Sequence, residues 1–137
     1  MKIALWVAQG ALALAFLAAG VMKLTMPLAD LHDSLSWTAD VPGTLVRLIG
    51  LAELLGALGL VLPTITRIRP RLAPLAAAAL ALVMVLATIF HVARGEFSML
   101  PATLVLAAGL AFVAWGRAVR LPVAPRVGTT RGPLQAA

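Results

Sequence analysis

The sequence predicts an all-α membrane protein: an antiparallel up-down bundle of four transmembrane helices with a short outer interfacial helix. Four apolar stretches fill most of the 137-residue chain, and each is near the roughly 20 residues that a helix needs to cross a hydrocarbon core. Charged residues make up only 12% of the composition and hydrophobic residues 62%, whereas a soluble domain carries about 25% charged residues. Short connections between the stretches favour antiparallel neighbours.

The expected spans cover about residues 3–24, 44–62, 72–93 and 99–115. Two prolines punctuate the loop between the second and third spans, and a Gly-Glu turn joins the third to the fourth. We expect one transmembrane domain over residues 1–118 and a basic, disordered cytoplasmic tail over residues 119–137. A cleaved signal peptide is the alternative for the first span, but the run is long for one, and its loss would leave the second span without a partner.

The outer segment, residues 25–43, is the longest connection between spans. Leu28, Leu31 and Leu35 recur at helical spacing, and prolines flank this run on both sides. We therefore expect a short amphipathic helix that lies on the outer leaflet or caps the bundle. A structured loop without a lid role is the alternative.

The charge distribution predicts the orientation. The net charge of +6 and the pI of about 11.7 would suggest nucleic acid in a soluble chain, but here the basic residues flank apolar spans, so no nucleic-acid partner is expected. Their bias to one side predicts a multi-pass protein of a bacterial-type inner membrane with both termini cytoplasmic. Eight of the eleven basic residues lie on that side: Lys2, Arg67, Arg69, Arg71, Arg117, Arg120, Arg126 and Arg131.

Small residues recur at helical spacing in every span. Such stripes let helix backbones approach closely in lipid, where packing drives association. The alternative is that alanine is merely abundant in this chain. The stripes are Ala11, Ala15 and Ala19; Gly50, Gly56 and Gly59; Ala77 and Ala81; and Ala107, Ala111 and Ala114.

Only four ionisable residues fall inside the expected spans, and they form the candidate site: Lys23, Arg47, Glu53 and His91. An ionisable group in hydrocarbon is costly and usually has a function. In the predicted orientation all four share the outer half of the bundle, and Glu53 is deepest, about 13 Å into its span at 1.5 Å per residue. They form a candidate ligand- or proton-binding pocket. Whether Glu53 is neutral or paired with a neighbouring cation stays open.

Each of these residues also has a structural interpretation. Lys23 can extend to the interface, Arg47 can anchor to phosphate, His91 can be a packed, hydrogen-bonded residue, and Glu53 can belong to a structural ion pair. For three other polar residues we expect interhelical hydrogen bonds only: Gln9, Thr88 and Thr103.

The composition also restricts the chemistry. The chain has no cysteine, which excludes thiolate catalysis, disulfide exchange and Cys-based metal sites. With two histidines and no ligands at metal-binding spacing, no metal site is expected. The absence of a haem or flavin motif argues against independent electron transfer. Catalytic residues stay unassigned, and an independent enzyme is not favoured.

The polar residues and their surroundings carry a family resemblance. The segments that carry it are Gly20-Val21-Met22-Lys23-Leu24, Trp37 in the outer loop, Arg47 to Ala57 (RLIGLAELLGA), Leu60-Val61-Leu62-Pro63, a late His91 and Pro101. Over roughly residues 3–118 the chain resembles the DoxX-like family of small four-helix integral membrane proteins. These motifs are short, and the spacing of Lys, Glu and His carries more weight than any one of them.

The resemblance implies a range of functions. Some members are associated with quinone-linked sulfur-compound oxidation, others with oxidative-stress assemblies, and a distant animal branch acts as a receptor-assembly chaperone. The resemblance further implies that Lys23, Glu53 and His91 line a shared polar pocket. Members that work through thiols depend on cysteine, so the lack of cysteine in this chain puts that function out of reach.

Three functional hypotheses follow. The first is a pocket for a hydrophobic small molecule, a quinone or a lipid, that supports a redox or stress-related membrane complex. The second is a non-enzymatic accessory or assembly subunit, chaperone-like, whose polar cluster only determines the helix packing. The third is a small proton-coupled transporter, although known small exporters place their glutamate in the first span. Expected partners are the bilayer, the hydrophobic ligand, a membrane or redox partner protein and, in a homodimer, a second copy.

Overall fold

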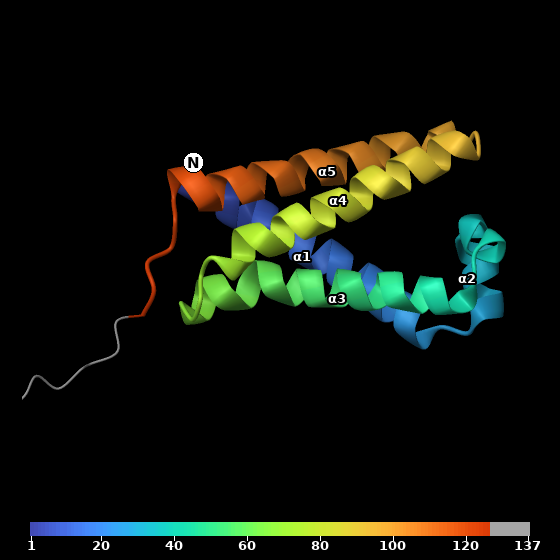
Figure 1. Ribbon diagram of the computed structural model, residues 1–137, viewed down its shortest axis with the longest axis horizontal. Helices are drawn as coiled ribbons and strands as arrows, with labels where there is room; N and C mark the ends of the chain where they lie inside the picture. Colours follow the sequence, from blue (N-terminus) through green and yellow to red (C-terminus); the bar gives the residue numbers. More distant parts are fainter. Residues whose placement is uncertain (127–137) are drawn as a thin grey trace, which may run out of the picture.

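The computed structural model describes residues 1–126, and this part of the chain is helical without a strand. Its four long helices, α1 (Lys2–Thr25), α3 (Gly43–Thr66), α4 (Leu72–Ala93) and α5 (Leu100–Trp115), alternate in direction (Figure 1). Short turns extend α5 at both ends, η2 (Phe97–Met99) and the π-helical η3 (Gly116–Arg120). With these turns included, all four helices are long and apolar enough to cross a membrane, which confirms the predicted fold class.

The four helices pack in a ring. α1 lies against α3 and α5, and α4 lies against the same two helices. Large apolar side chains such as Leu14, Leu55, Leu82 and Val105 remain exposed on the outside. In a bilayer this surface meets lipid, and the apolar exterior is what a membrane bundle requires.

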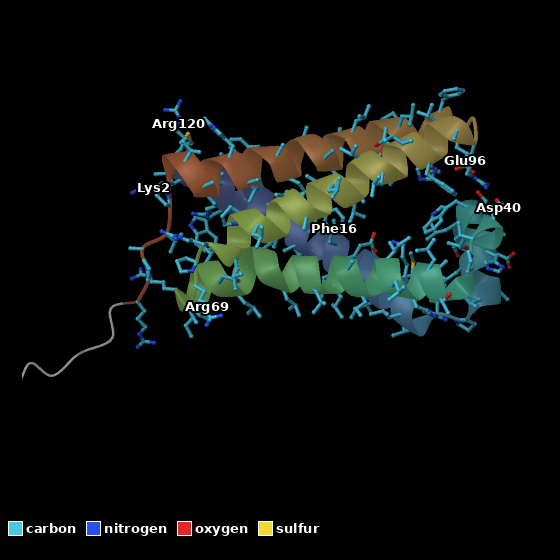
Figure 2. The ribbon with its side chains drawn as sticks, viewed as in Figure 1. Lys2, Phe16, Asp40, Arg69, Glu96 and Arg120 are labelled. Atoms are coloured by element: carbon cyan, nitrogen blue, oxygen red, sulfur yellow. The ribbon has the colours of Figure 1, made fainter. Side chains whose placement is uncertain are left out.

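The two ends of the bundle differ in charge (Figure 2). The basic end holds the start of α1, the α3–α4 loop and the end of α5, with Lys2, Arg67, Arg69, Arg71, Arg117, Arg120 and Arg126. The acidic end holds α2, η1 and the α4–α5 turn, with Asp30, Asp33, Asp40 and Glu96. Much of the predicted tail, residues 127–137, lies outside the described residues.

α1 and α3 approach each other through two glycines. A Cβ placed on Gly20 would lie 2.7 Å from the carbonyl oxygen of Gly50 and 2.8 Å from the backbone nitrogen of Leu54. These are backbone atoms, which cannot move aside cheaply, so the close contact requires glycine. The predicted stripe on this helix is wrong in part, because Ala11 and Ala15 are exposed.

α3 and α4 do use their small residues, whereas Ala111 of the predicted stripe on α5 is exposed. A Cβ on Gly56 would meet the Leu80 side chain, and a Cβ on Gly59 would lie 2.8 Å from the Cβ of Ala76. Both glycines therefore allow α4 to pack closely against α3. Ala77 of α4 is fully buried. Close approach at small residues is the expected packing mode in lipid, where no hydrophobic force drives helices together.

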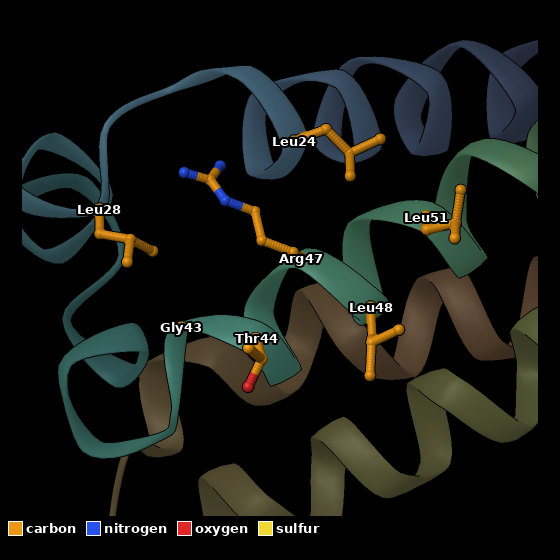
Figure 3. A pocket seen from close by; sticks show the side chains of 7 residues that line it. All are labelled: Leu24, Leu28, Gly43, Thr44, Arg47, Leu48 and Leu51. Atoms are coloured by element: carbon orange, nitrogen blue, oxygen red, sulfur yellow. The ribbon is translucent and has the colours of Figure 1, made fainter.

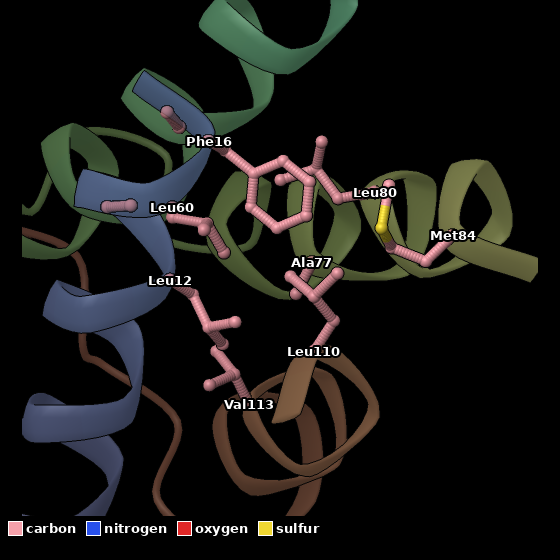
Figure 4. Close-up of a cluster of buried hydrophobic side chains, with 10 residues drawn as sticks. Leu12, Phe16, Leu60, Ala77, Leu80, Met84, Leu110 and Val113 are labelled. Carbon is pink, nitrogen blue, oxygen red and sulfur yellow. The ribbon is translucent and has the colours of Figure 1, made fainter. Parts of the chain in front are cut away.

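All four helices contribute to the apolar core (Figure 4). Phe16 of α1, Leu60 of α3, Leu80 of α4 and Leu110 of α5 are at most 2% exposed. Figure 4 shows the Phe16 ring projecting toward Leu80. This layer lies between the charged ends and holds both helix pairs in one bundle.

α3 extends further than the sequence predicted. The helix continues through Pro63 to Thr66, beyond the expected end near residue 62. Proline removes one backbone donor, but membrane helices tolerate it because Ser and Thr side chains and neighbouring helices satisfy the freed groups. At the end of the helix, Thr66 Oγ1 donates to the carbonyl of Leu62 at 2.7 Å, which is not the Gly59 carbonyl that Pro63 leaves without its helical donor. Arg67, with a φ of 58°, then ends the helix in the left-handed region.

A short helix, α2 (Leu28–Ser34), and a 3₁₀ turn, η1 (Ser36–Asp40), form the outer segment. Leu31 is fully buried and anchors α2. Trp37 meets the ring of Phe90 on α4 edge to face, with centroids 6.2 Å apart. The segment is therefore tied to the bundle at the acidic end, as expected of a cap.

Candidate functional site

The candidate site centres on an ion pair between α1 and α3. Lys23 Nζ lies 2.7 Å from Glu53 Oε2, and the two residues are only 6% and 4% exposed. The other carboxylate oxygen, Oε1, accepts no hydrogen bond from the described residues, yet it is not among their fully enclosed polar atoms. The pair is therefore balanced in charge and keeps one acceptor free.

The glycine contact allows this pair to form. Gly20 lies three residues before Lys23, and Gly50 lies three residues before Glu53, so each glycine shares a helix face with its charged neighbour. A Cβ on Gly50 would lie 2.7 Å from the Cβ of Lys23. Without side chains at these positions, the lysine stem fits against α3 and its ammonium reaches the carboxylate.

Arg47 lies in the space between the end of α1 and the start of α2 (Figure 3). Its guanidinium donates to the backbone carbonyls of Lys23 and Met26, the latter at 2.7 Å. The last carbonyls of a helix have no intrahelical donor, and a cation at that end also complements the helix dipole. Arg47 thus caps α1 and holds Lys23 in place from the backbone side.

Two apolar grooves follow the α1–α3 contact on either side of the ion pair along the helices. The groove toward the acidic end measures about 670 Å³, and Arg47 is its charged lining residue (Figure 3). The groove toward the basic end measures about 350 Å³ and has the lining Gly10, Ala13, Leu14, Leu17, Ala57, Leu58, Val61 and Leu62. Ala57 follows Glu53 by four residues, so this groove begins about one helical turn from Glu53.

His91 takes part in a separate network. Its Nδ1 lies 2.6 Å from Glu96 Oε2, and Arg94 donates to Glu96 Oε1 at 3.0 Å and to Asp40. Ser36 Oγ lies 3.5 Å from the same Glu96 oxygen. The network joins η1 to the end of α4 and ties the cap down.

The charges of this network reinforce one another. Hydrogen bonds from Arg94, and then from His91, lower the pKa of Glu96 below its ordinary value. The carboxylates of Glu96 and Asp40 in turn raise the pKa of Arg94. Both groups therefore stay ionised through the neutral range.

The structure thus divides the four predicted site residues into two groups. Lys23, Glu53 and Arg47 adjoin one another at the α1–α3 contact. His91 has its hydrogen bond with Glu96, in the turn just beyond its own helix. The sequence analysis predicted Glu96 only as part of a turn. A His–Glu pair five residues apart is not a recognisable motif, so its hydrogen bond to His91 was not expected.

A second buried polar cluster lies at the basic end. Gln9 Nε2 donates to the carbonyl of Leu60 and to Thr64 Oγ1, and Gln9 Oε1 accepts from Arg117 Nε at 2.8 Å. Gln9 thus makes the expected interhelical bonds. Arg117 was predicted only as a topology signal, but it is 7% exposed. Its position two residues after Trp115 gave no sign of burial.

The remaining polar predictions concern α4, α5 and metal binding. Thr88 Oγ1 donates to Thr103 Oγ1 at 2.9 Å, an interhelical hydrogen bond as expected. Within residues 1–126 there is no group of three or more His, Cys, Asp or Glu side chains that could hold a metal ion.

These features define a class: a small polytopic membrane protein built as a four-helix bundle with buried charged groups. The model of the DoxX-like family matches residues 7–113. The match covers most of the chain, and the chain belongs to this family, as the resemblance indicated. No curated protein and no solved structure matches the chain significantly.

Proposed function

We propose that this DoxX-like protein binds a hydrophobic small molecule with a polar head, a quinone or a lipid, beside the Lys23–Glu53 pair. One observation carries the proposal: the buried pair leaves Glu53 Oε1 without a hydrogen bond among the described residues and not fully enclosed. A polar group without a hydrogen-bond partner is costly at membrane depth, where no water replaces that partner. A ligand hydroxyl that donates to it would remove that cost.

The chemistry of the site suits such a ligand. The carboxylate accepts a hydrogen bond from a hydroxyl, and the remaining protons of the Lys23 ammonium can be donated to a carbonyl. A quinol and a quinone present these two groups in turn. The apolar groove that begins beside Ala57 has room for an isoprenoid or acyl tail. Arg47 and His91 contribute indirectly, through the end of α1 and through the cap.

The first test is mass spectrometry of organic extracts from protein purified in mild detergent. Glu53→Gln removes the carboxylate but leaves Lys23 unpaired, so it is compared with the charge-free pair Lys23→Met/Glu53→Leu. Arg120→Gln, at the exposed basic end, is the matched control. We expect a quinone or a specific lipid with wild type and Arg120→Gln, and its loss from both site variants. The same generic lipid in all four samples would contradict the proposal.

A second candidate is an accessory or assembly subunit that binds a membrane or redox partner protein. Its support is that Lys23 and Glu53 satisfy each other's charge within the chain and join α1 to α3. Under this alternative the charge-free pair keeps full function in cells, because packing is retained. Under the ligand proposal the same variant folds but loses function.

The cellular setting is part of the proposal. We place the protein in a bacterial-type inner membrane, with the basic end and both termini in the cytoplasm. The separation of basic and acidic residues to opposite ends supports this orientation. We also propose that residues 1–118 form the transmembrane domain and that residues 119–137 form the cytoplasmic tail.

A further inference from the structure

Arg117 is a buried cation in the last turn of the fourth span. The residue is 7% exposed, and its guanidinium lies over the ring of Trp6, 4.7 Å from the centroid. Its one hydrogen bond within the described residues is from Nε to Gln9 Oε1. The structure therefore holds the side chain in one position at the basic end.

The position is built by the surrounding helices. A Cβ on Gly116 would collide with the Leu5 side chain, so the glycine lets the end of α5 approach α1. Gln9 is oriented by its two bonds to α3, at Leu60 and Thr64, and presents its oxygen to the arginine. The guanidinium is thus held by a neutral amide and an aromatic ring.

The far edge of the guanidinium is unused. Nη2 is enclosed and has no hydrogen-bond partner among residues 1–126, and Nη1 also makes no hydrogen bond there but is not enclosed. Arg94 at the acidic end also has one unpartnered nitrogen, but two carboxylates balance its charge. Arg117 has no such balance within the described residues.

No acidic residue lies in the segments that form the basic end. The acidic residues of the chain are Asp30, Asp33, Asp40, Glu53 and Glu96, and none precedes Asp30 or follows Glu96. Glu53 is separated from Thr64, the Gln9 partner, by eleven residues of helix, about 16 Å. A buried charge without a counter-ion is strongly destabilising. A negative charge from outside the described residues would balance Arg117.

We propose that Arg117 binds a phosphate group at the basic end of the bundle. The guanidinium is a permanent cation, and its accessible Nη1 carries N–H donors that can bind a phosphate oxygen. Nη1 provides the open approach, and the surrounding arginines raise the local positive potential. The phosphate belongs either to an anionic phospholipid headgroup or to free phosphate, because both present the same oxygens.

The test uses the emission of Trp6, which reports on the stacked guanidinium. Trp37→Phe/Trp115→Phe protein is reconstituted in nanodiscs of phosphatidylcholine, with or without phosphatidylglycerol, and separately titrated with inorganic phosphate. Arg117→Gln removes the cation, and Arg120→Gln removes a neighbouring exposed one. Native mass spectrometry of the same proteins counts the lipids that remain bound.

A Trp6 response and a retained phosphatidylglycerol that are lost in Arg117→Gln but kept in Arg120→Gln establish a headgroup site. A saturable response to inorganic phosphate, without retained lipid and with the same dependence on Arg117, establishes a free-phosphate site. We expect at least a tenfold loss of affinity in Arg117→Gln. If the wild-type protein responds to neither source, or Arg117→Gln responds as wild type, the proposal is wrong. A wild-type protein that responds to neither source overturns the proposal even if the variant does not fold.

Discussion

The Lys23–Glu53 pair is the residue-level feature on which the proposed site depends. Removing one partner of a buried pair leaves an uncompensated charge, whereas replacing both with apolar residues of similar volume is often neutral. We expect Glu53→Leu or Lys23→Met alone to lower the free energy of unfolding by about 3–5 kcal/mol. The double variant should recover most of that loss.

Unfolding in detergent, followed by tryptophan fluorescence, measures this double-mutant cycle. Additive losses in the double variant would show that the two side chains do not stabilise each other. Thr44→Ala, an exposed position on α3, serves as the control for the purification and should leave stability within about 0.5 kcal/mol.

Glu96 makes the cap sensitive to acid at the residue scale. Its pKa is lowered in the folded protein by hydrogen bonds from Arg94 and His91. A lowered folded pKa means that the stabilisation is complete above the unfolded value of about 4.3 and is lost as the pH falls through the folded value. Arg94, whose pKa is raised, stays charged throughout this window.

Trp37 reports on this transition because it packs on Phe90 beside the network. In protein that retains only this tryptophan, we expect its emission to change as the pH falls below about 4.3, before the bundle unfolds. Glu96→Gln should show the acid form of the emission already at neutral pH. An unchanged acid transition in that variant would mean that another group controls the cap.

Helix pairing is the element-level feature, and the two glycines between α1 and α3 determine it. A Cβ on Gly20 would lie 2.7 Å from a backbone oxygen, so Gly20→Ala must separate the helices and is expected to cost about 1–3 kcal/mol. Because Lys23 then loses its reach to Glu53, ligand binding should fall as well. Thermal unfolding in detergent measures the first effect.

Gly10 on the same helix is the matched control. A Cβ there meets nothing within 4 Å, and alanine favours helix over glycine by about 1 kcal/mol. Gly10→Ala should therefore be neutral or stabilising. Equal losses from Gly10→Ala and Gly20→Ala would show that close approach is not what Gly20 provides.

Orientation belongs to the whole molecule. The basic end should face the cytoplasm, because positively charged loops are retained there. The chain has no native cysteine, so single cysteines can be introduced without removing others. Ile68 in the α3–α4 loop and Ser98 in the α4–α5 turn are both exposed and lie at opposite ends.

We expect a membrane-impermeant maleimide to label Ser98→Cys in intact cells and Ile68→Cys only after lysis. The reverse pattern would invert the protein and place the proposed phosphate site on the outer side. Labelling of both positions in intact cells would indicate dual insertion, the behaviour of small exporters, and would favour the transporter hypothesis.

The sequence by itself determined the fold class, the number of spans and the residues that are costly in lipid. Hydropathy and length carry this information locally, since a span needs about 20 apolar residues whatever its neighbours are. For the same reason Leu72–Ala93 was predicted with its observed bounds. The position of Lys23 and Glu53 in the candidate site was also readable from the cost of charge in hydrocarbon.

Only the tertiary structure decided which partners these residues have. Helix rotation, which no single span encodes, pairs Lys23 with Glu53 but directs His91 to Glu96. It also turns Ala11 outward, although its spacing resembles an interface, and buries Arg117 beside Gln9. Contacts between residues 108 positions apart depend on how the helices pack, and packing in lipid is decided by the fit of whole surfaces.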